Sequence, residues 1–315
     1  MVKVRSLPLG VDIGKTRIRV AAAVRAASGK PVLVGVATSE LPDDAECASA
    51  VLEDLRRELG TRERRCVLSL PASNGVLKVV RFPKMSDSER RHAARFESER
   101  IAPWDSKEIA TVVRAHWVNV REGLVAIGVA REDALRPRVA CARRAGLSVS
   151  GVDHDACAML RAFPFADAVL DVGYEASSLH VFSASGLFSI TIPVGGSEVT
   201  AGICRDLGID SSAAERRKRI LGTAGAGEAA RDAFVGRAAA AIAEVRERNP
   251  IRRIAMTGNG ARLPGLPEAM EAASGAMVDV PVSDLLRVPA YPDDVARSAA
   301  PDWTLAASLA AWETP

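Results

Sequence analysis

Short apolar runs separated by turns dominate the first part of the chain. The runs at 9–13, 18–24 and 32–38 are rich in Val, Ile, Leu and Ala, which predicts three consecutive strands. Residues 45–59 instead place their apolar side chains three or four positions apart, which predicts an amphipathic helix. Another apolar run at 66–70 predicts a further strand. The expected order is therefore strand, strand, strand, helix, strand.

The second half of the chain begins with the same pattern. Strands are predicted at 168–172, 178–183 and 187–192, followed by a helix at about 197–207. Further elements follow: helices at about 211–220, 228–248 and 265–273, and strands at 251–256 and 277–280. In both halves an Asp-x-Gly turn comes directly after the first strand. A repeated unit of this kind predicts two similar α/β lobes that face each other across a cleft.

A segment with a different pattern separates the two repeats, at about 76–150. Ser86 followed by Glu89 is a capping box, which predicts the start of a helix. The apolar stretches 111–118 and 123–130 predict a pair of strands across a short turn. The segment is therefore expected to be a small α/β insert in the first lobe.

A helix near 132–145 closes this segment, with Pro137 expected in its first turn, where the missing N–H is tolerated. The expected domains follow from these elements: lobe one at 1–168 with the insert at about 76–150, lobe two at 169–315, and a C-terminal helix at about 302–312 that packs back on lobe one.

Composition and charge exclude several function classes. The chain has 315 residues, with 42 basic and 39 acidic residues and a net charge of +3, so nothing favours a nucleic-acid partner. The first residues lack the apolar core of a signal peptide, and no apolar run is long enough to cross a bilayer. The cysteines are odd in number and never form C-x-x-C, which predicts reduced thiols of a cytosolic protein: Cys47, Cys66, Cys141, Cys157 and Cys204.

Several local runs, taken in order, resemble the actin-like ATPase superfamily and, within it, the PilM family of type IV pilus assembly proteins. The cytoplasmic part of the type II secretion protein GspL is also similar. The runs are LGVDIGKTRIRV, SLPASNGVLKVVRFPKMSDSE, ESERIAPWDSKEI, ARRAGLSVSGVDHDACAMLRA, IPVGGSEVTAGICRDLGIDSSAAERRKR and MTGNGARLPGL. The resemblance covers nearly the whole chain. It implies an actin-like ATPase fold, with two RNase H-like lobes around a nucleotide cleft and a small α/β insert in lobe one.

The turn at Asp12 is the candidate first phosphate loop. Gly14 lets backbone N–H groups approach an anion, Lys15 could assist a β-phosphate, and the Thr16 hydroxyl could donate to a phosphate. Alone, an Asp-x-Gly turn is better explained as a plain β-turn. The second Asp-x-Gly turn, together with the run MTGNGARLPGL, which resembles the family's adenosine-binding motif, favours a nucleotide.

Asp171, Gly173 and Ser177 match the second phosphate loop of the family, with Ser177 in place of the usual Thr. Glu175 departs from the pattern. A carboxylate about 4 Å from a phosphate charge costs roughly 4 kcal/mol at an effective dielectric near 20. Either Glu175 points away from the cleft, or the site binds nucleotide weakly.

The resemblance assigns further nucleotide contacts. The adenosine loop is matched by Gly258, Asn259 and Gly260, and a glycine pair, Gly195 and Gly196, precedes the helix whose N-terminus faces the cleft in the family. Glu215 and Lys218 would contact ribose and adenine by the same resemblance. Taken by themselves, these last two form an ordinary solvated i, i+3 pair.

The resemblance also implies ATP and Mg²⁺ as ligands. Asp12 and Asp171 are expected to hold Mg²⁺ through water, since magnesium usually keeps several waters in nucleotide sites. Asp155 matches the position of the residue that orients the attacking water and is a weak candidate for the general base. Although His154 lies between two carboxylates in VDHD, we expect no direct chelation of a metal there. Whether ATP is hydrolysed or only bound stays open, with weak or absent hydrolysis expected.

The function implied by the resemblance is that of an ATP-binding cytoplasmic scaffold. It would recruit the N-terminal cytoplasmic tail of a PilN-like inner-membrane protein and contact other pilus or secretion platform proteins, without inserting into the membrane itself. The tail is expected near residues 76–130, which include Arg81, Phe82 and Trp104. A small-molecule, sugar-type kinase or an FtsA-like filament protein on the same fold are the alternatives.

Overall fold

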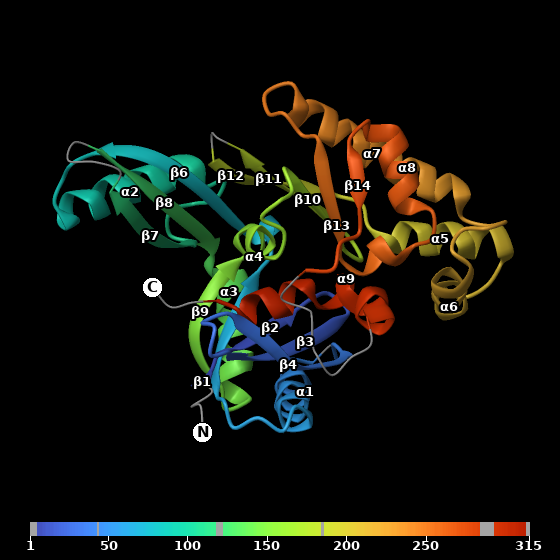
Figure 1. The fold of residues 1–315 in the computed structure, drawn as a ribbon, viewed down its shortest axis with the longest axis horizontal. Helices are drawn as coiled ribbons and strands as arrows, with labels where there is room; N and C mark the ends of the chain where they lie inside the picture. The colour runs from blue at the N-terminus through green and yellow to red at the C-terminus, as the bar shows by residue number, and fades with distance from the viewer. Residues whose placement is uncertain (1–4, 43, 118–121, 184–185, 284–292, 313–315) are drawn as a thin grey trace.

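A computed structural model of the chain describes residues 5–42, 44–117, 122–183, 186–283 and 293–312. The strands form three separate sheets, of six, five and three strands. Figure 1 shows the six-stranded sheet below, the five-stranded sheet at the upper right and the three-stranded sheet at the upper left.

The six-stranded sheet is built from the first repeat. Three antiparallel strands lead into two parallel ones, so the order is β4-β3-β2-β5-β9, with β1 extending the line of β2 beside β3. Its strands are β1 (Arg5–Ser6), β2 (Leu9–Ile13), β3 (Arg17–Arg25), β4 (Pro31–Glu40), β5 (Arg65–Leu70) and β9 (Ser148–His154).

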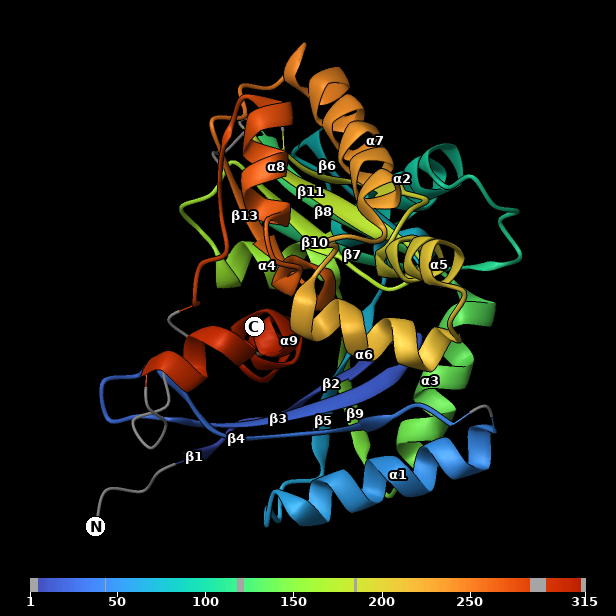
Figure 2. The ribbon, with the colours of Figure 1, turned by 90° about the vertical axis from the view of Figure 1, so that its right-hand side faces the viewer.

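Helices cover both faces of this sheet (Figure 2). On one face α1 (Ala45–Glu58) and α3 (Glu132–Arg144) bury Leu52 and Ala142 against the strands. On the other face lies α9 (Asp293–Ala310), whose Ala306 and Ala310 pack on β3. The helix expected at 302–312 therefore begins earlier, at Asp293, and continues through Pro301.

The five-stranded sheet repeats this topology, in the order β12-β11-β10-β13-β14. The same meander of three antiparallel strands leads into two parallel strands, so the predicted repeat of the two halves is confirmed at the level of strand order. Its strands are β10 (Ala168–Val172), β11 (Ser177–Ser183), β12 (Gly186–Ile192), β13 (Arg253–Thr257) and β14 (Met277–Asp279).

One face of the five-stranded sheet packs against α5, α7 and α8 in the largest apolar cluster, while α4 covers the other face. The helix α4 (Asp155–Ala162) precedes the second repeat, whose own helices are α5 (Gly196–Leu207), α6 (Ser211–Leu221), α7 (Glu228–Arg246) and α8 (Leu266–Ser274). Short 3₁₀ turns lie at η1 (Ala72–Asn74) and η2 (Asn259–Arg262).

The three-stranded sheet and α2 make up the insert. The strands β6 (Gly75–Pro83), β8 (Glu122–Arg131) and β7 (Ile109–Trp117) are antiparallel in that order, and α2 (Asp87–Ile101) packs on one face. The capping box predicted at the start of α2 is confirmed, because Ser86 and Glu89 exchange hydrogen bonds. Residue 118, at the end of one predicted strand, lies outside the described residues.

Pro137 lies deeper in α3 than expected. The helix begins at Glu132, so Pro137 is its sixth residue and belongs to the second turn. The prediction of a first-turn proline was therefore wrong. The acidic first turn, with Glu132 and Asp133, favours starting the helix this early because negative charge stabilises a helix N-terminus.

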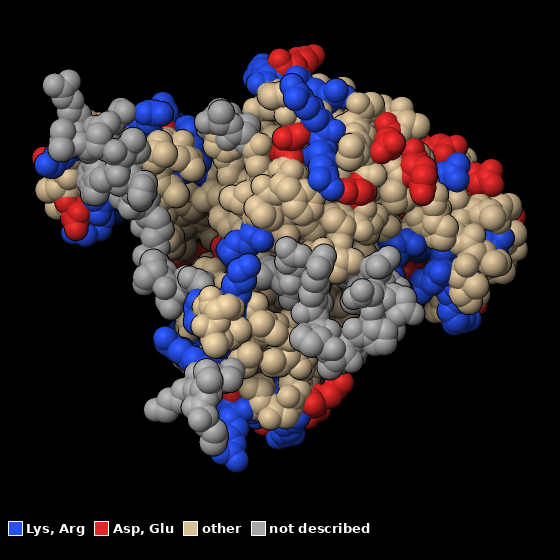
Figure 3. All heavy atoms as spheres, viewed as in Figure 1, with Lys and Arg blue, Asp and Glu red and all other residues tan. Residues whose placement is uncertain are grey.

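Basic and acidic side chains are interspersed over the face of the molecule drawn in Figure 3, as the near-balanced charge count implies. Among the described residues, no helix combines the length and the apolar character needed to span a bilayer.

Candidate functional site

The two Asp-x-Gly loops occupy equivalent places in the two sheets. The first joins β2 to β3 and is closed by a 2.9 Å hydrogen bond from the Gly14 N–H to the Arg17 carbonyl. The second joins β10 to β11, and a Cβ on Gly173 would overlap the carbonyl of Ala176. A Cβ on Gly14 would likewise stand 3.2 Å from the Arg17 carbonyl oxygen, so both turns are too tight for a side chain to be added freely at their glycine.

Lys15 and Glu175 connect the tips of these loops. The Nζ of Lys15 lies 3.0 Å from Oε2 of Glu175, and both side chains are exposed. Exposed ion pairs contribute at most about 1 kcal/mol, so this pair marks proximity more than stability. Glu175 thus points across to the first loop, which places both loop tips at one site.

Asp12 lies buried at the base of the first loop. Its Oδ2 accepts a hydrogen bond from Nη1 of Arg19 at 3.2 Å, and its Oδ1 accepts one from the Ser69 hydroxyl at 3.0 Å. The carboxylate is therefore held in one orientation by partners from β3 and β5. The guanidinium of Arg19 also comes within 3.6 Å of the position a Cβ on Gly14 would take.

A second arginine, Arg138, supports the first loop from α3. Its Nη1 donates to the carbonyl of Ala134 and its Nη2 to the carbonyl of Ile13, at 3.2 and 3.3 Å. The buried Nε of Arg138 has no hydrogen-bond partner among the described residues. Neither Arg19 nor Arg138 was predicted from the sequence as part of the site.

Three carboxylates approach one another where the two lobes meet. Burial, reinforced by the charges of Asp12 and Asp171, raises the pKa of Asp155 well above its usual range. Burial and the charge of Asp12 raise the pKa of Asp171 to about 6, while Arg19 opposes this shift. Oδ1 of Asp155 is buried and has no hydrogen-bond partner in the described part of the chain. Residues 12, 155 and 171 therefore share one electrostatic environment.

Ser177 and the glycine pair build the support of the second loop. The Ser177 hydroxyl is buried and donates to the Val194 carbonyl at 2.8 Å, so it holds the loop to the chain that follows β12. The N–H of Gly196 donates to the carbonyl of Gly173 at 2.9 Å, and a Cβ on Gly195 would overlap Tyr174. The N-terminus of α5 is therefore fastened to the loop by hydrogen bonds.

Lys218 and Glu215 also brace α5. The ammonium of Lys218 donates to Glu215 Oε2 at 2.6 Å, to the Thr200 hydroxyl at 2.7 Å and to the Gly196 carbonyl at 2.9 Å. Thr200 itself lies 2.7 Å from Glu215 Oε2. All three donors of the ammonium are engaged. The pair is therefore a partly buried network rather than a solvated surface pair.

The adenosine-type loop packs directly on the second phosphate loop. Gly258 has φ +81°, and a Cβ there would overlap the carboxylate of Asp171. A Cβ on Gly260 would overlap the side chain of Val172, while Asn259 is exposed. Only glycine permits the approach at 258 and 260, which brings this loop to the end of β10.

The arrangement offers oxygen ligands but no preformed chelate. No group of three carboxylate, histidine or cysteine side chains lies close enough to bind a metal directly, within the ranges described. His154 has a structural role, because its Nδ1 accepts a hydrogen bond from the Ala156 N–H at 3.1 Å and caps α4. Burial lowers the pKa of His154, which keeps the ring neutral.

Of the remaining predicted residues, Lys15 and Thr16 are exposed at the first loop, where the carbonyl of Thr16 accepts from the Leu41 N–H at 2.8 Å. The structure thus brings the residues of the two predicted phosphate loops and of the predicted adenosine loop together, with Asp155 beside them. It places Ser177, Glu215 and Lys218 behind the second loop, where their polar groups are engaged with the protein itself.

Solved structures with the same architecture include a PilM–PilN type IV pilus biogenesis complex, at TM-score 0.83 and 22% identity over 97% of this chain and 98% of the other. The ethanolamine utilization protein EutJ from Carboxydothermus hydrogenoformans matches at TM-score 0.61 and 16% identity, over 97% and 89% of the two chains. A diol dehydratase-reactivating factor in nucleotide-free form matches at 0.59 and 10%, over 97% and 99%. The expected actin-like ATPase fold is thereby confirmed.

No curated protein matches the chain by sequence. The family model described as type IV pilus assembly protein PilM matches residues 10–310, from β2 to the end of α9. The chain therefore belongs to the PilM family of type IV pilus assembly proteins.

Proposed function

We propose that this type IV pilus assembly protein is an ATP-binding scaffold at the cytoplasmic side of the inner membrane, which recruits the tail of a PilN-like membrane protein. The observation that supports the nucleotide part is the meeting of the two phosphate loops, with Lys15 and Glu175 3.0 Å apart. Loops from two lobes that share one site can hold a single phosphate chain between them.

Within this site the backbone of Gly14 and Gly173 would face the phosphates, and Lys15 and Arg19 would supply positive charge. The adenosine would lie toward the loop of Gly258, where two glycines keep side chains out of the way. The polar networks around Ser177 and Lys218 fix the positions of these loops.

Magnesium would be held through water by Asp12 and Asp171. The absence of a direct chelating group among the described residues supports water-mediated binding rather than a protein cage. The bound ion would supply charge neutralisation for the phosphate chain, and Asp155, buried and unpaired at Oδ1, faces the same environment.

Hydrolysis of ATP is proposed to be weak or absent. A general base must be ionised to take a proton from water, and its pKa should lie near the operating pH. Burial and two neighbouring carboxylates raise the pKa of Asp155 well above its ordinary range, which favours the protonated form. This supports a nucleotide that stabilises the two lobes rather than one that is turned over.

The membrane-protein tail is proposed to bind at the insert, near residues 76–130. The solved complex of PilM with PilN supports a partner of this kind for the family. Phe82 packs against the apolar core of the insert, whereas Arg81 is exposed and Trp104 is half-buried, so the latter two are the better candidates for contacts with the tail. Other pilus or secretion platform proteins would associate through the same scaffold.

The proposed domains are lobe one at 1–168, with the insert at about 76–150, and lobe two at 169–315. The three separate sheets and the repeated strand order support this division. Because α9 packs on β2 and β3, the C-terminal helix is proposed to belong physically to lobe one.

Calorimetric titration of ATP and ADP, with and without Mg²⁺, tests the nucleotide site. Binding is expected for the wild type and weakened about tenfold or more in Arg19→Ala, whereas Glu268→Gln on the exposed side of α8 should bind as the wild type does. A wild type that binds neither nucleotide would overturn the nucleotide part. Capture of the immobilised tail of a PilN-like protein tests the partner separately, and failure of capture would overturn only that part.

A further inference from the structure

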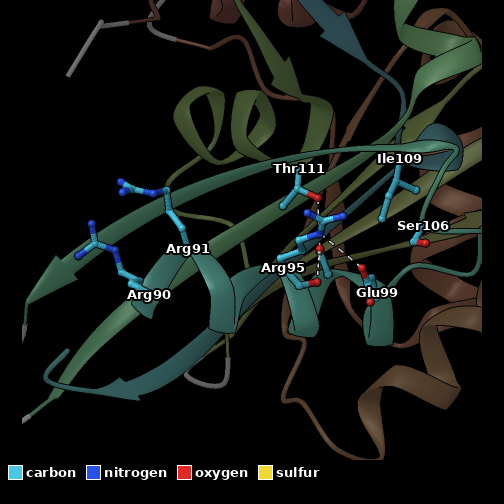
Figure 4. A pocket seen from close by; sticks show the side chains of 8 residues that line it. Arg90, Arg91, Arg95, Glu99, Ser106, Ile109 and Thr111 are labelled. Carbon is cyan, nitrogen blue, oxygen red and sulfur yellow. Dashed lines mark hydrogen bonds and ion pairs between the residues drawn. The ribbon is translucent and has the colours of Figure 1, made fainter. Parts of the chain in front are cut away.

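A cavity of about 490 Å³ opens in the insert, away from the two phosphate loops. It lies between α2 and the beginning of β7 (Figure 4). Its lining is formed by Arg90, Arg91, Arg95, Ser98, Glu99, Ser106, Ile109 and Thr111. The hydroxyls of Ser98 and Thr111 lie 3.2 Å apart and join helix to strand across the cavity.

The lining is strongly basic. Three arginines face one acidic residue, Glu99, which lies 3.6 Å from Arg95. Arg90 is paired with Asp87 at the start of the helix, at 2.7 Å. Arg91 forms no ion pair or hydrogen bond with any residue that the structure describes. The cavity therefore has an excess of positive charge that the insert itself does not neutralise.

The wall of this cavity opposite α2 is an edge strand. β7 pairs with β8 along its whole length, Ile109–Trp117, and no described strand pairs with its other side. An edge strand presents a row of backbone N–H and C=O groups that can pair with an added strand. Alternate residues of such a strand would face α2, because Thr111 on β7 already does so.

We propose that β7 binds an extended acidic segment of a partner protein as a fourth strand of the insert. Backbone hydrogen bonds to β7 would hold the segment, and its Asp or Glu side chains on the α2 side would meet Arg91 and Arg95. Charge complementarity selects this occupant, since the net positive charge of the lining, with Arg91 outside any ion pair among the described residues, would repel a basic segment. The inference goes beyond the proposed function, because it requires neither a nucleotide nor the PilN-like tail.

Fluorescence anisotropy with two labelled heptapeptides tests the charge requirement. The first alternates Thr and Glu, and the second alternates Thr and Lys. The Glu peptide is expected to bind at least tenfold more tightly than the Lys peptide, and to weaken tenfold or more in Arg91→Glu and Arg95→Glu. Equal binding of the two peptides, or no binding of the Glu peptide to wild-type protein, would overturn the proposal.

Arg100→Glu is the matched control, because Arg100 lies on the same helix, outside the cavity, and the charge change is the same. It should change the affinity for the Glu peptide less than threefold. An effect as large as that of Arg91→Glu would contradict the assignment of the peptide site to this cavity. Should either reversal variant fail to fold, Arg91→Ala and Arg95→Ala replace it, with a three- to tenfold loss expected.

A Glu peptide with N-methyl groups on alternate residues tests the added strand. Its charge is unchanged, but it lacks the donors that pair with one strand edge. Methylation on the donors facing β7 should abolish binding, while methylation on the opposite donors should leave it within about threefold. Equal binding of both methylated forms would contradict strand addition. Strand addition would also be contradicted if inorganic phosphate bound the site and the Glu peptide did not displace it.

Discussion

The ammonium of Lys15 lies 3.0 Å from the carboxylate of Glu175, and these two residues come from facing loops of the two lobes. A phosphate entering between the loops would compete with Glu175 for Lys15. The pair would therefore act directly on nucleotide affinity at the proposed site.

Replacing Glu175 by Gln should raise the affinity for ATP by about three- to tenfold. At an effective dielectric near 20, like charges about 4 Å apart repel by about 4 kcal/mol, and exposure of the side chain reduces this considerably. Titration calorimetry at low and high salt measures the effect, which should shrink at high salt. Lys15→Gln should act in the opposite direction, and Glu268→Gln should leave the affinity unchanged. Unchanged affinity in Glu175→Gln would show that its carboxylate does not act on the phosphate site.

Gly258→Ala should destabilise the protein and weaken nucleotide binding together. The residue has φ +81° and ψ 166°, a region open essentially to glycine alone, at a cost of about 1–3 kcal/mol for other residues. The new methyl group would also overlap the carboxylate of Asp171. Chemical denaturation and ATP titration measure the two effects.

Gly265→Ala is the control for this substitution. Gly265 also has a positive φ, +78°, but a Cβ there would meet no atom within 4 Å. It should therefore lose only about 1–2 kcal/mol of stability and keep its nucleotide affinity. A similar loss of affinity in both variants would mean that the effect comes from general destabilisation.

Asp171 should make stability fall as pH rises through the mildly acidic range. Its pKa is about 6 in the folded protein, against a usual 3.8, so the folded state holds the proton more tightly than the unfolded chain. The loss of folding free energy caused by ionising Asp171 is absent below pH 3.8 and complete above about pH 6. It reaches about 3 kcal/mol at most. Asp171→Asn should therefore be stabilising at pH 7.5 and nearly neutral at pH 4.

Urea denaturation of wild type and Asp171→Asn between pH 4 and 8 measures this difference. Asp54→Asn, an exposed position on α1, should give a curve parallel to that of the wild type. A gain from Asp171→Asn that is the same at every pH would argue against titration of the carboxylate as its cause.

Ser86→Ala should loosen the start of α2. The Ser86 hydroxyl accepts from the Glu89 N–H, and Ala cannot replace this bond, whereas the bond from the Ser86 N–H to the Glu89 carboxylate at 2.8 Å uses the backbone and can persist. Hydrogen exchange of the first-turn amides should accelerate by roughly two- to tenfold. Ser88→Ala, two residues into the same helix, should not accelerate it, and equal acceleration in both variants would count against a specific cap.

Most of the fold could be predicted from apolar periodicity, because the two sheets bury short continuous runs such as those of β2 and β10. The elements that the sequence analysis did not predict include β1, β6, β9 and α4. In β6 most residues are only half-buried, so no clear apolar alternation marks the strand. In α4 the N-cap is His154, a residue that sequence rules do not expect to cap a helix.

The candidate site could be predicted where glycine or aspartate stands at a strand end, as at Asp12 and Gly258. Arg19 and Arg138 could not, since an arginine in a strand or helix gives no sign of where its guanidinium lies. The orientation of Glu175 also depends on a residue 160 positions away in the chain, Lys15. Such long-range pairs lie outside what local patterns can indicate.

Gly10 in β2 is so close to α9 that a Cβ on it would overlap the backbone of Ala306 and stand 2.5 Å from the N of Ala310. One face of the first sheet is thus covered by residues that are synthesised almost 300 positions later. During translation that face stays uncovered until α9 has left the ribosome. Lobe one therefore cannot complete its folding before α9 has been made, and ribosomes stalled before codon 293 would display an apolar sheet that attracts chaperones.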